Sequence, residues 1–179
     1  DKVAYLMQGE HWSFEALSLP HRNPVLFVLL PSAVRRDQVA LPAFTRWTWA
    51  LEGKYPGHVL CVADPTMRLH DQLRLGWCLG TAEHDATAEL AALVRGLARA
   101  RGIPAEGIVT YGSSAGGFAA LALAAHLPGS TAVAINPQTD LLSYEHTGQV
   151  NLVREVCFDG AEPEVIRREH GPRVDMALR

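Results

Sequence analysis

The chain has 179 residues, of which 48% are apolar and 20% charged, with 19 acidic and 16 basic side chains and a net charge of −3. A chain of this length buries about 70% of the surface that its unfolded form exposes, so it needs no disulfide or metal to fold. The near-neutral charge excludes a basic nucleic-acid-binding arm and a polybasic membrane patch, and no run of about 18 apolar residues predicts a membrane span. No repeat, low-complexity tract or linker divides the sequence, and we predict a single domain over residues 1–179.

The chain begins with a predicted antiparallel pair of strands within residues 2–17. An apolar run there is followed by a Gly-Glu turn and then by alternating apolar and polar residues. Four later apolar runs are nearly unbroken, as expected for strands covered on both faces: residues 25–30, 59–63, 108–111 and 132–135. Strands of this kind are typically parallel.

Helical periodicity lies between these strands. The strongest pattern covers residues 84–101 and is ended by Gly102. A helix rich in alanine and leucine is predicted over residues 115–126, and a weaker one over residues 42–51. The alternation of strands and helices predicts an α/β fold, with a mostly parallel sheet that carries helices on both faces.

Ligands of such sheets bind beyond the carboxyl ends of the strands, so chemistry is expected there. The strand at 108–111 runs directly into Gly112-Ser113-Ser114-Ala115-Gly116 and then into a helix. In this context a Gly-x-Ser-x-Gly motif forms a sharp turn, in which the two glycines let the strand and helix backbones approach. The motif predicts that Ser114 is a nucleophile exposed at the edge of the sheet, with the Ala115 amide facing a developing oxyanion.

This motif resembles the nucleophile elbow of the α/β-hydrolase superfamily, and the antiparallel pair followed by parallel strands is similar to its strand order, over about residues 2–140. The resemblance implies a serine-dependent acyl hydrolase of the esterase or thioesterase type, with an acyl-enzyme on Ser114. Alternatively, it implies an acyltransferase that uses the same intermediate to acetylate a sugar or alcohol. It also implies a second oxyanion donor, the amide of Ser32 or Ala33, because Pro31 has no N–H. The loop lacks the His-Gly-Gly-Gly sequence of lipases and esterases.

In the family, an acid and then a histidine follow the serine, on loops after later strands. Asp140 is the acid by its position, with Asp159 and Asp175 as rivals, and His170 is preferred to His146 as the general base. No apolar run after the four strands is as strand-like as they are, so the late strands that would carry these residues are weak or absent. The alternative is that the histidine lies outside this chain.

Other interpretations of the turn remain beside this one. A glycine-rich turn at a helix N-terminus also suits a phosphate group, and a binding module could have kept the turn and lost the base. No histidine and cysteine spacing resembles a metal site, so no metal or cofactor is predicted, and the expected partner is a small acyl substrate. The three cysteines form no close pair, which favours a reducing, cytoplasmic location.

Overall fold

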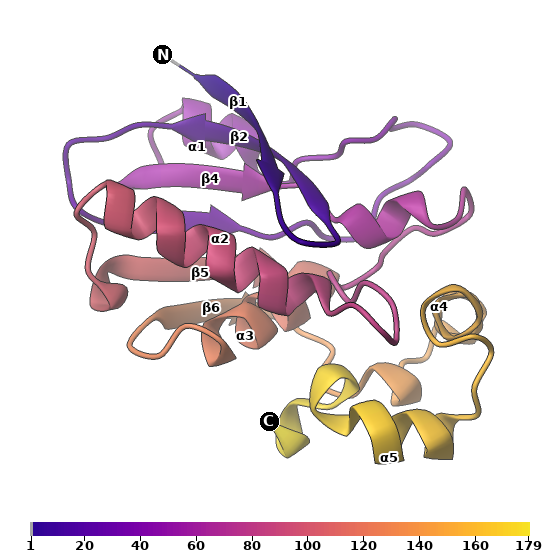
Figure 1. The fold of residues 1–179 in the computed structure, drawn as a ribbon. Helices are drawn as coiled ribbons and strands as arrows, with labels where there is room; N and C mark the ends of the chain where they lie inside the picture. Colours follow the sequence, from indigo (N-terminus) through magenta and orange to yellow (C-terminus); the bar gives the residue numbers. More distant parts are fainter. Residues whose placement is uncertain (1) are drawn as a thin grey trace.

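The computed structural model describes residues 2–179, and a six-stranded sheet runs through its centre (Figure 1). Its strands are β1 (Val3–Gln8), β2 (Ser13–Leu19), β3 (Leu26–Leu29), β4 (His58–Val62), β5 (Ile108–Ser113) and β6 (Thr131–Ile135). They lie in the order β1-β2-β4-β3-β5-β6, where β1 and β2 are antiparallel to their neighbours and β3 to β6 are parallel. All six strands predicted from the sequence are therefore confirmed.

Helices cover both faces of this sheet. The helices are α1 (Trp47–Leu51), α2 (Ala86–Ala100), α3 (Ala115–Ala125), α4 (Thr147–Cys157) and α5 (Pro163–Val174). Short 3₁₀ turns are η1 (Pro65–Arg68), η2 (Ala105–Gly107), η3 (Leu141–Ser143) and η4 (Met176–Leu178). In Figure 1, α2 and α3 lie in front of the sheet and α1 lies behind it. The predicted α/β class, with a mostly parallel sheet, is confirmed.

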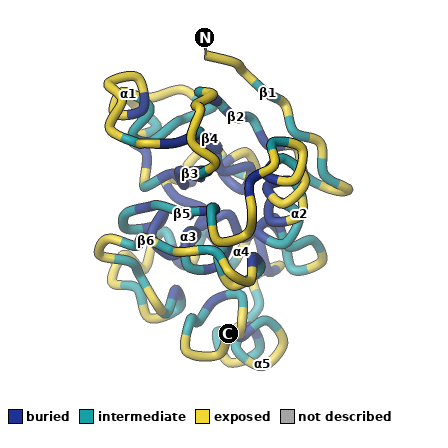
Figure 2. Tube along the Cα trace, turned by 90° about the vertical axis from the view of Figure 1, so that its left-hand side faces the viewer, coloured by how far each residue is buried: buried dark blue, intermediate teal, exposed yellow. Residues whose placement is uncertain are grey.

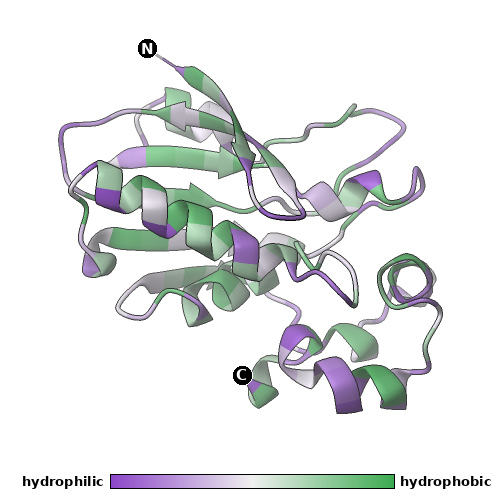
Figure 3. Cartoon of the chain, viewed as in Figure 1, coloured by the Kyte–Doolittle hydropathy of each residue, from purple (hydrophilic) through white to green (hydrophobic). Residues whose placement is uncertain are grey.

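The core lies mainly between the sheet and the α2 and α3 side. Leu90 of α2 and Leu123 of α3 are completely buried and belong to one cluster with Val28 and Leu60 of the central strands. Figure 2 shows the buried part of the trace concentrated in these central elements, whereas β1 is largely exposed. In Figure 3 the central strands are mostly green, whereas α2 carries both hydrophobic and hydrophilic residues. None of the helices within residues 2–179 has both the length and the apolar character needed to cross a bilayer.

The helix boundaries follow from local signals. α2 begins where the Asp85 carboxylate accepts a hydrogen bond from the Ala88 amide at 3.1 Å, and it ends before Gly102, whose φ is 65°. α1 is much shorter than the predicted helix over residues 42–51. Arg46 has a φ of 58° there, and this left-handed backbone prevents the helix from starting earlier.

Helices, not strands, follow β6. The segment from η3 to η4 lies beyond the carboxyl ends of the parallel strands (Figure 1) and packs through Val153, Ile166 and Val174 on a second buried cluster that contains Trp77 and Phe118. α5 is interrupted at His170, two residues before Pro172, because a proline inside a helix removes one N–H and crowds the preceding turn. Late strands are thus absent from residues 2–179, as the weak sequence pattern indicated.

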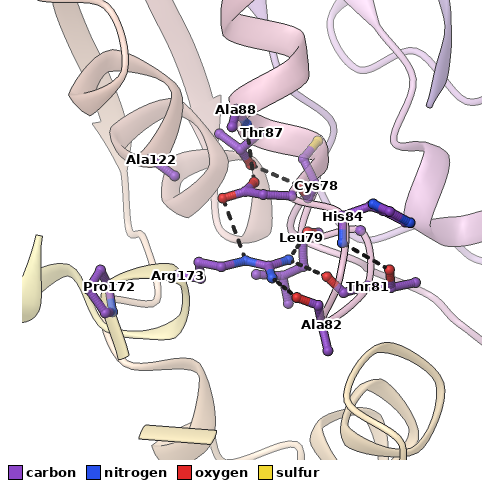
Figure 4. A network of polar contacts seen from close by, with 12 residues as sticks. Cys78, Leu79, Thr81, Ala82, His84, Thr87, Ala88, Ala122, Pro172 and Arg173 are labelled. Carbon is purple, nitrogen blue, oxygen red and sulfur yellow. Dashed lines mark hydrogen bonds and ion pairs between the residues drawn. The ribbon is translucent and has the colours of Figure 1, made fainter. Parts of the chain in front are cut away.

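The Arg173 side chain holds the C-terminal helix α5 in place. Figure 4 shows Arg173 of α5 reaching into the loop before α2, where its guanidinium donates to the carbonyls of Leu79, Thr81 and Ala82 at 2.6, 2.7 and 3.0 Å. It also lies 3.5 Å from the carboxylate of Asp85. The C-terminal helix is thereby tied to the N-terminus of α2.

Candidate active site

Ser114 occupies a strained turn between β5 and α3. Its φ is 53° and its ψ is −122°, a conformation that a residue with a Cβ adopts only under constraint. The Ser114 carbonyl accepts hydrogen bonds from the amides of Gly117 and Phe118 at 2.9 and 3.2 Å, so the helix starts immediately after the serine. The side chain is half-buried at the carboxyl edge of the sheet.

The glycines on either side make this turn possible. A Cβ at Gly112 would lie 2.0 Å from the Gly116 carbonyl oxygen, and a Cβ at Gly116 would lie 2.5 Å from the Leu30 carbonyl oxygen. Both positions therefore need a residue without a side chain. The second close approach also brings the end of β3 against the elbow, where the resemblance to α/β-hydrolases implies a second oxyanion donor.

The Ser114 hydroxyl has a defined partner. Gln138, three residues after β6, donates a hydrogen bond from Nε2 to Ser114 Oγ at 3.0 Å. Trp77 donates from its indole N–H to Oε1 of the same amide at 3.1 Å. Three side chains from three distant parts of the sequence therefore form one hydrogen-bonded row that ends on the candidate nucleophile.

A buried carboxylate shapes the turn that carries Trp77. Asp64, which follows β4, accepts hydrogen bonds from the amides of Thr66 at 2.9 Å and Cys78 at 3.0 Å. Burial raises the pKa of Asp64 above its ordinary value, although these hydrogen bonds act in the opposite direction. A Cβ at Gly76 would meet the same carboxylate at 2.7 Å, so the turn is packed closely around it. Asp64 is thus a structural group under Trp77.

The loop after β3 provides the second side of the site. Ser32 Oγ donates to the Ser113 carbonyl at 2.8 Å, which fixes the loop against the elbow. The Ser32 amide is already bound, since it donates to Thr45 Oγ1 at 3.0 Å. Within residues 2–179, the amides of Ala33 and Ala115 donate no hydrogen bond, so of the three predicted donors these two are free for an oxyanion.

A cavity of about 420 Å³ opens beside this loop. Its wall contains Ala33, Tyr144 and His146, together with the first turn of α4. Tyr144 packs edge-on against Trp77, with 6.0 Å between ring centroids, and thus connects the cavity wall with the row of side chains on Ser114. The volume of the cavity is in the range of small-molecule sites in proteins. Within residues 2–179, no three histidine, cysteine, aspartate or glutamate side chains gather in a way that could hold a metal ion.

The predicted acid and base make other contacts. Asp140 accepts hydrogen bonds from Arg167 at 2.8 Å, Ser143 at 2.6 Å and the Leu142 amide at 3.1 Å. Burial alone would raise the pKa of Asp140, but the hydrogen bonds from Arg167 and its neighbours outweigh it and hold the pKa below its usual value. His170 packs against the Phe158 ring at 5.3 Å between centroids.

None of the eight histidines donates a hydrogen bond to Ser114 or accepts one from it within residues 2–179. Asp140 and His170 are not joined by a hydrogen bond either, because Asp140 is bound to the Arg167 side of α5 while His170 faces Phe158. His146 lies on the cavity wall and packs edge-on against Tyr144 at 5.0 Å between centroids. The acid–base pair stays a prediction that these contacts do not support.

Comparison with known proteins tests the fold. No protein-family model matches the chain, and neither does any curated protein. A solved capsule O-acetyltransferase of Neisseria meningitidis serogroup A has a TM-score of 0.66 at 16% identity, over 98% of this chain and 65% of that chain. An esterase/lipase from an uncultured bacterium has a TM-score of 0.59 at 18% identity, over 98% of this chain and 59% of that chain. The chain has an α/β-hydrolase-like fold.

The likeness to these α/β-hydrolase structures covers almost all of this chain and part of theirs. A histidine-to-alanine mutant of the capsule O-acetyltransferase in complex with CoA gives a TM-score of 0.67 at 16% identity, over 98% of this chain and 66% of that one. The chain thus spans less than two thirds of the length of these neighbours. At such identities the likeness concerns the fold, and the predicted α/β-hydrolase-like architecture is confirmed.

Sequence reasoning about this α/β-hydrolase fold missed Gln138 and Trp77. Gln138 stands in the segment Asn136-Pro137-Gln138-Thr139-Asp140 at a strand end, so the rule that chemistry lies at strand ends pointed to the right segment. The expected triad requires an acid after this strand, and Asp140, two residues later, fits that expectation. Trp77 had no signal, because buried tryptophans are ordinarily core residues.

Proposed function

We propose that this protein is an enzyme that transfers acyl groups through a covalent intermediate on Ser114. The observation that carries the proposal is the strained conformation of Ser114, at φ 53°, with its hydroxyl held by Gln138 and followed by the free amide of Ala115 at the start of α3. Backbone strain at a half-buried serine between a strand and a helix is costly, and it supports a role in which the oxygen must be presented to a substrate.

The proposed reaction has two half-reactions. Ser114 Oγ attacks the carbonyl carbon of an ester or thioester and gives its proton to a base. The resulting oxyanion accepts hydrogen bonds from the amides of Ala115 and Ala33, since the Ser32 amide is bound to Thr45. Collapse of the intermediate expels the alcohol or thiol with a proton and leaves the acyl group on Ser114. Water or an alcohol then attacks that ester and releases the serine.

The base of this reaction is proposed to be a histidine that is not among the eight in this chain. Support comes from the contacts of Ser114, whose hydroxyl meets an amide and no imidazole within residues 2–179. His170 is the alternative if α5 moves, because its helix is already interrupted at that residue. His170→Ala distinguishes these two possibilities, because the protein should lose activity only if His170 is the base.

Water and an alcohol are both candidate acceptors. The esterase/lipase fold likeness supports hydrolysis, the first candidate from the sequence. The likeness to a capsule O-acetyltransferase, one form of which was solved with CoA, supports acetyl transfer from a thioester to a carbohydrate hydroxyl as the second. Both candidates share the acyl-enzyme on Ser114.

Labelling with a fluorophosphonate probe tests the nucleophile. We expect the probe to modify Ser114 in the wild type, at a rate that rises with pH, and peptide mapping to place the adduct on Ser114 and not on Ser113. Ser114→Ala should abolish labelling. Ser13→Ala, which removes an exposed hydroxyl at the start of β2, is the matched control and should label as the wild type does. A wild type that stays unlabelled up to pH 10 would refute the proposal.

The acceptor is tested with acetyl-CoA. Thiol release that is independent of added sugar indicates hydrolysis, whereas release that requires a carbohydrate and yields an acetylated sugar indicates transfer. The two outcomes differ in whether the site excludes water from the acyl-enzyme.

A further inference from the structure

We propose that Gln138 is a further catalytic residue, which donates a hydrogen bond to the attacking oxygen of Ser114, and that Trp77 is the positioning residue that fixes its amide. The inference rests on the proposed acyl-enzyme chemistry. It goes beyond that chemistry by assigning a donor to the nucleophile itself, on the side of the site formed by β6.

The direction of each hydrogen bond follows from Trp77. An indole N–H can only donate, so the amide atom that faces it at 3.1 Å is the oxygen of Gln138. The NH₂ group must then face Ser114, 3.0 Å away, and Ser114 Oγ accepts. The hydroxyl proton of the serine is therefore left free to be given to a base. Gln138 cannot be that base, because a primary amide that donates here does not take up a proton.

Both partners are held firmly enough to impose this direction. Trp77 is 1% exposed and sits in a turn with a φ of 52°, followed by Cys78 at 55°, whose amide is bound to the buried Asp64. On the other side, Pro137 is packed against the start of α3, where a Cβ at Gly117 would lie 3.1 Å from the proline ring. The amide of Gln138 is thus fixed by its indole partner and by the backbone that carries it.

A donor at this position acts on charge that develops on Oγ. When Ser114 loses its proton the oxygen becomes negative, and a hydrogen bond to a charged acceptor is stronger than one to a neutral hydroxyl. After acylation Oγ is an ester oxygen and accepts poorly, so the contact weakens. When the acyl group leaves, Oγ is the leaving group and the charge returns. Gln138 therefore favours both half-reactions without taking part in proton transfer.

The experiment is the pH dependence of fluorophosphonate labelling at Ser114. In Gln138→Met, which keeps the length of the side chain, we expect a rate about 10- to 100-fold below the wild type at pH 7 and a profile displaced to higher pH. Gln138→Glu keeps the acceptor for Trp77 but places a carboxylate next to the Ser114 hydroxyl. Its labelling rate should be lower than that of Gln138→Met. Trp77→Phe removes the indole N–H together with the five-membered ring and keeps an aromatic six-membered ring, and it should slow labelling less than Gln138→Met. Gln8→Met, at an exposed position of β1, should leave the rate unchanged.

The outcomes separate the proposals. A Gln138→Met protein that is folded and has the wild-type rate and pH profile would overturn this inference alone, and so would a Gln138→Glu protein that labels faster, since the position would then serve a base. Absence of a label on wild-type Ser114 would overturn both this inference and the proposed function. Thermal unfolding checks the fold of each variant, and Gln138→Glu decides the matter if the methionine variant does not fold.

Discussion

Single residues without a side chain decide whether the elbow can form. Gly112→Ala would push a methyl group to 2.0 Å from the Gly116 carbonyl oxygen, and backbone on both sides leaves little room for relief. We expect it to lower the free energy of unfolding by at least about 3 kcal/mol, measured by urea denaturation. Gly96→Ala is the matched control, because nothing lies within 4 Å of its Cβ on the exposed side of α2. It should raise stability by about 0.5–1 kcal/mol. Equal effects of the two changes would contradict this account of the elbow.

At the scale of elements, one carboxylate joins the N-terminal hairpin to α2. Glu89 accepts hydrogen bonds from the amides of His11 and Trp12, each at 3.0 Å to its Oε2. Burial raises its pKa, but the bonds from His11 and Trp12 outweigh it, so the pKa lies below the usual 4.5. A lowered pKa stabilises the fold above the unfolded value, and this contribution is lost as the pH falls from about 4.5 through the folded value.

Glu89→Gln tests this contact. The amide oxygen can take the place of Oε2, but the NH₂ group then replaces Oε1, which lies 3.1 Å from the His11 amide and 3.0 Å from its ring Nδ1. The negative charge is also lost, and we expect a loss of about 1–2 kcal/mol at pH 7. The loss should shrink as the pH falls below about 4.5, because the wild-type carboxyl is itself protonated as the pH passes through its lowered pKa. Glu10→Gln, one residue from the contact and exposed, should follow the wild-type curve. Urea unfolding at pH 3, 4, 5 and 7 gives both curves; a constant difference across this range would contradict the account.

The elements up to β6 could be predicted because each carries a local signal. Unbroken apolar runs predict the parallel strands, Gly102 predicts the end of α2, and the elbow glycines predict the start of α3. α1 was predicted too long, since a left-handed Arg46 has no sequence signature. α4 carries an amphipathic pattern, with Val150, Val153 and Cys157 on its buried face, that the family expectation of late strands obscures. The pattern of α5 is broken by Gly171 and Pro172.

At the scale of the whole molecule, the site could be predicted only as far as it is local. Ser114 and its glycines are contiguous, so spacing revealed them. Gln138 and Trp77 come from loops after β6 and before α2, and they meet through a sheet order in which β5 and β6 are neighbours and β4 lies two strands away. The sequence allows the Ser32 amide as the second oxyanion donor. Its hydrogen bond to Thr45 depends on the path of the loop between β3 and α1, which has no periodic pattern that would predict it.

Arg173 connects the end of the chain with this site, because the carbonyls it binds follow Trp77 by two to five residues. The Arg173 side chain is 13% exposed, and Arg173→Ala would leave three carbonyls and Asp85 without their cation. We expect a loss of about 2–4 kcal/mol in the free energy of unfolding. Arg173→Lys should recover only part of this stability, since an ammonium group lacks the planar fork that reaches several carbonyls.

Arg168→Ala is the matched control. The Arg168 side chain is 68% exposed and pairs with its neighbour Glu169, so this change should alter stability by less than about 0.5 kcal/mol. If urea denaturation gave the same value for Arg173→Ala and Arg168→Ala, the C-terminal helix would not brace the loop that carries Trp77.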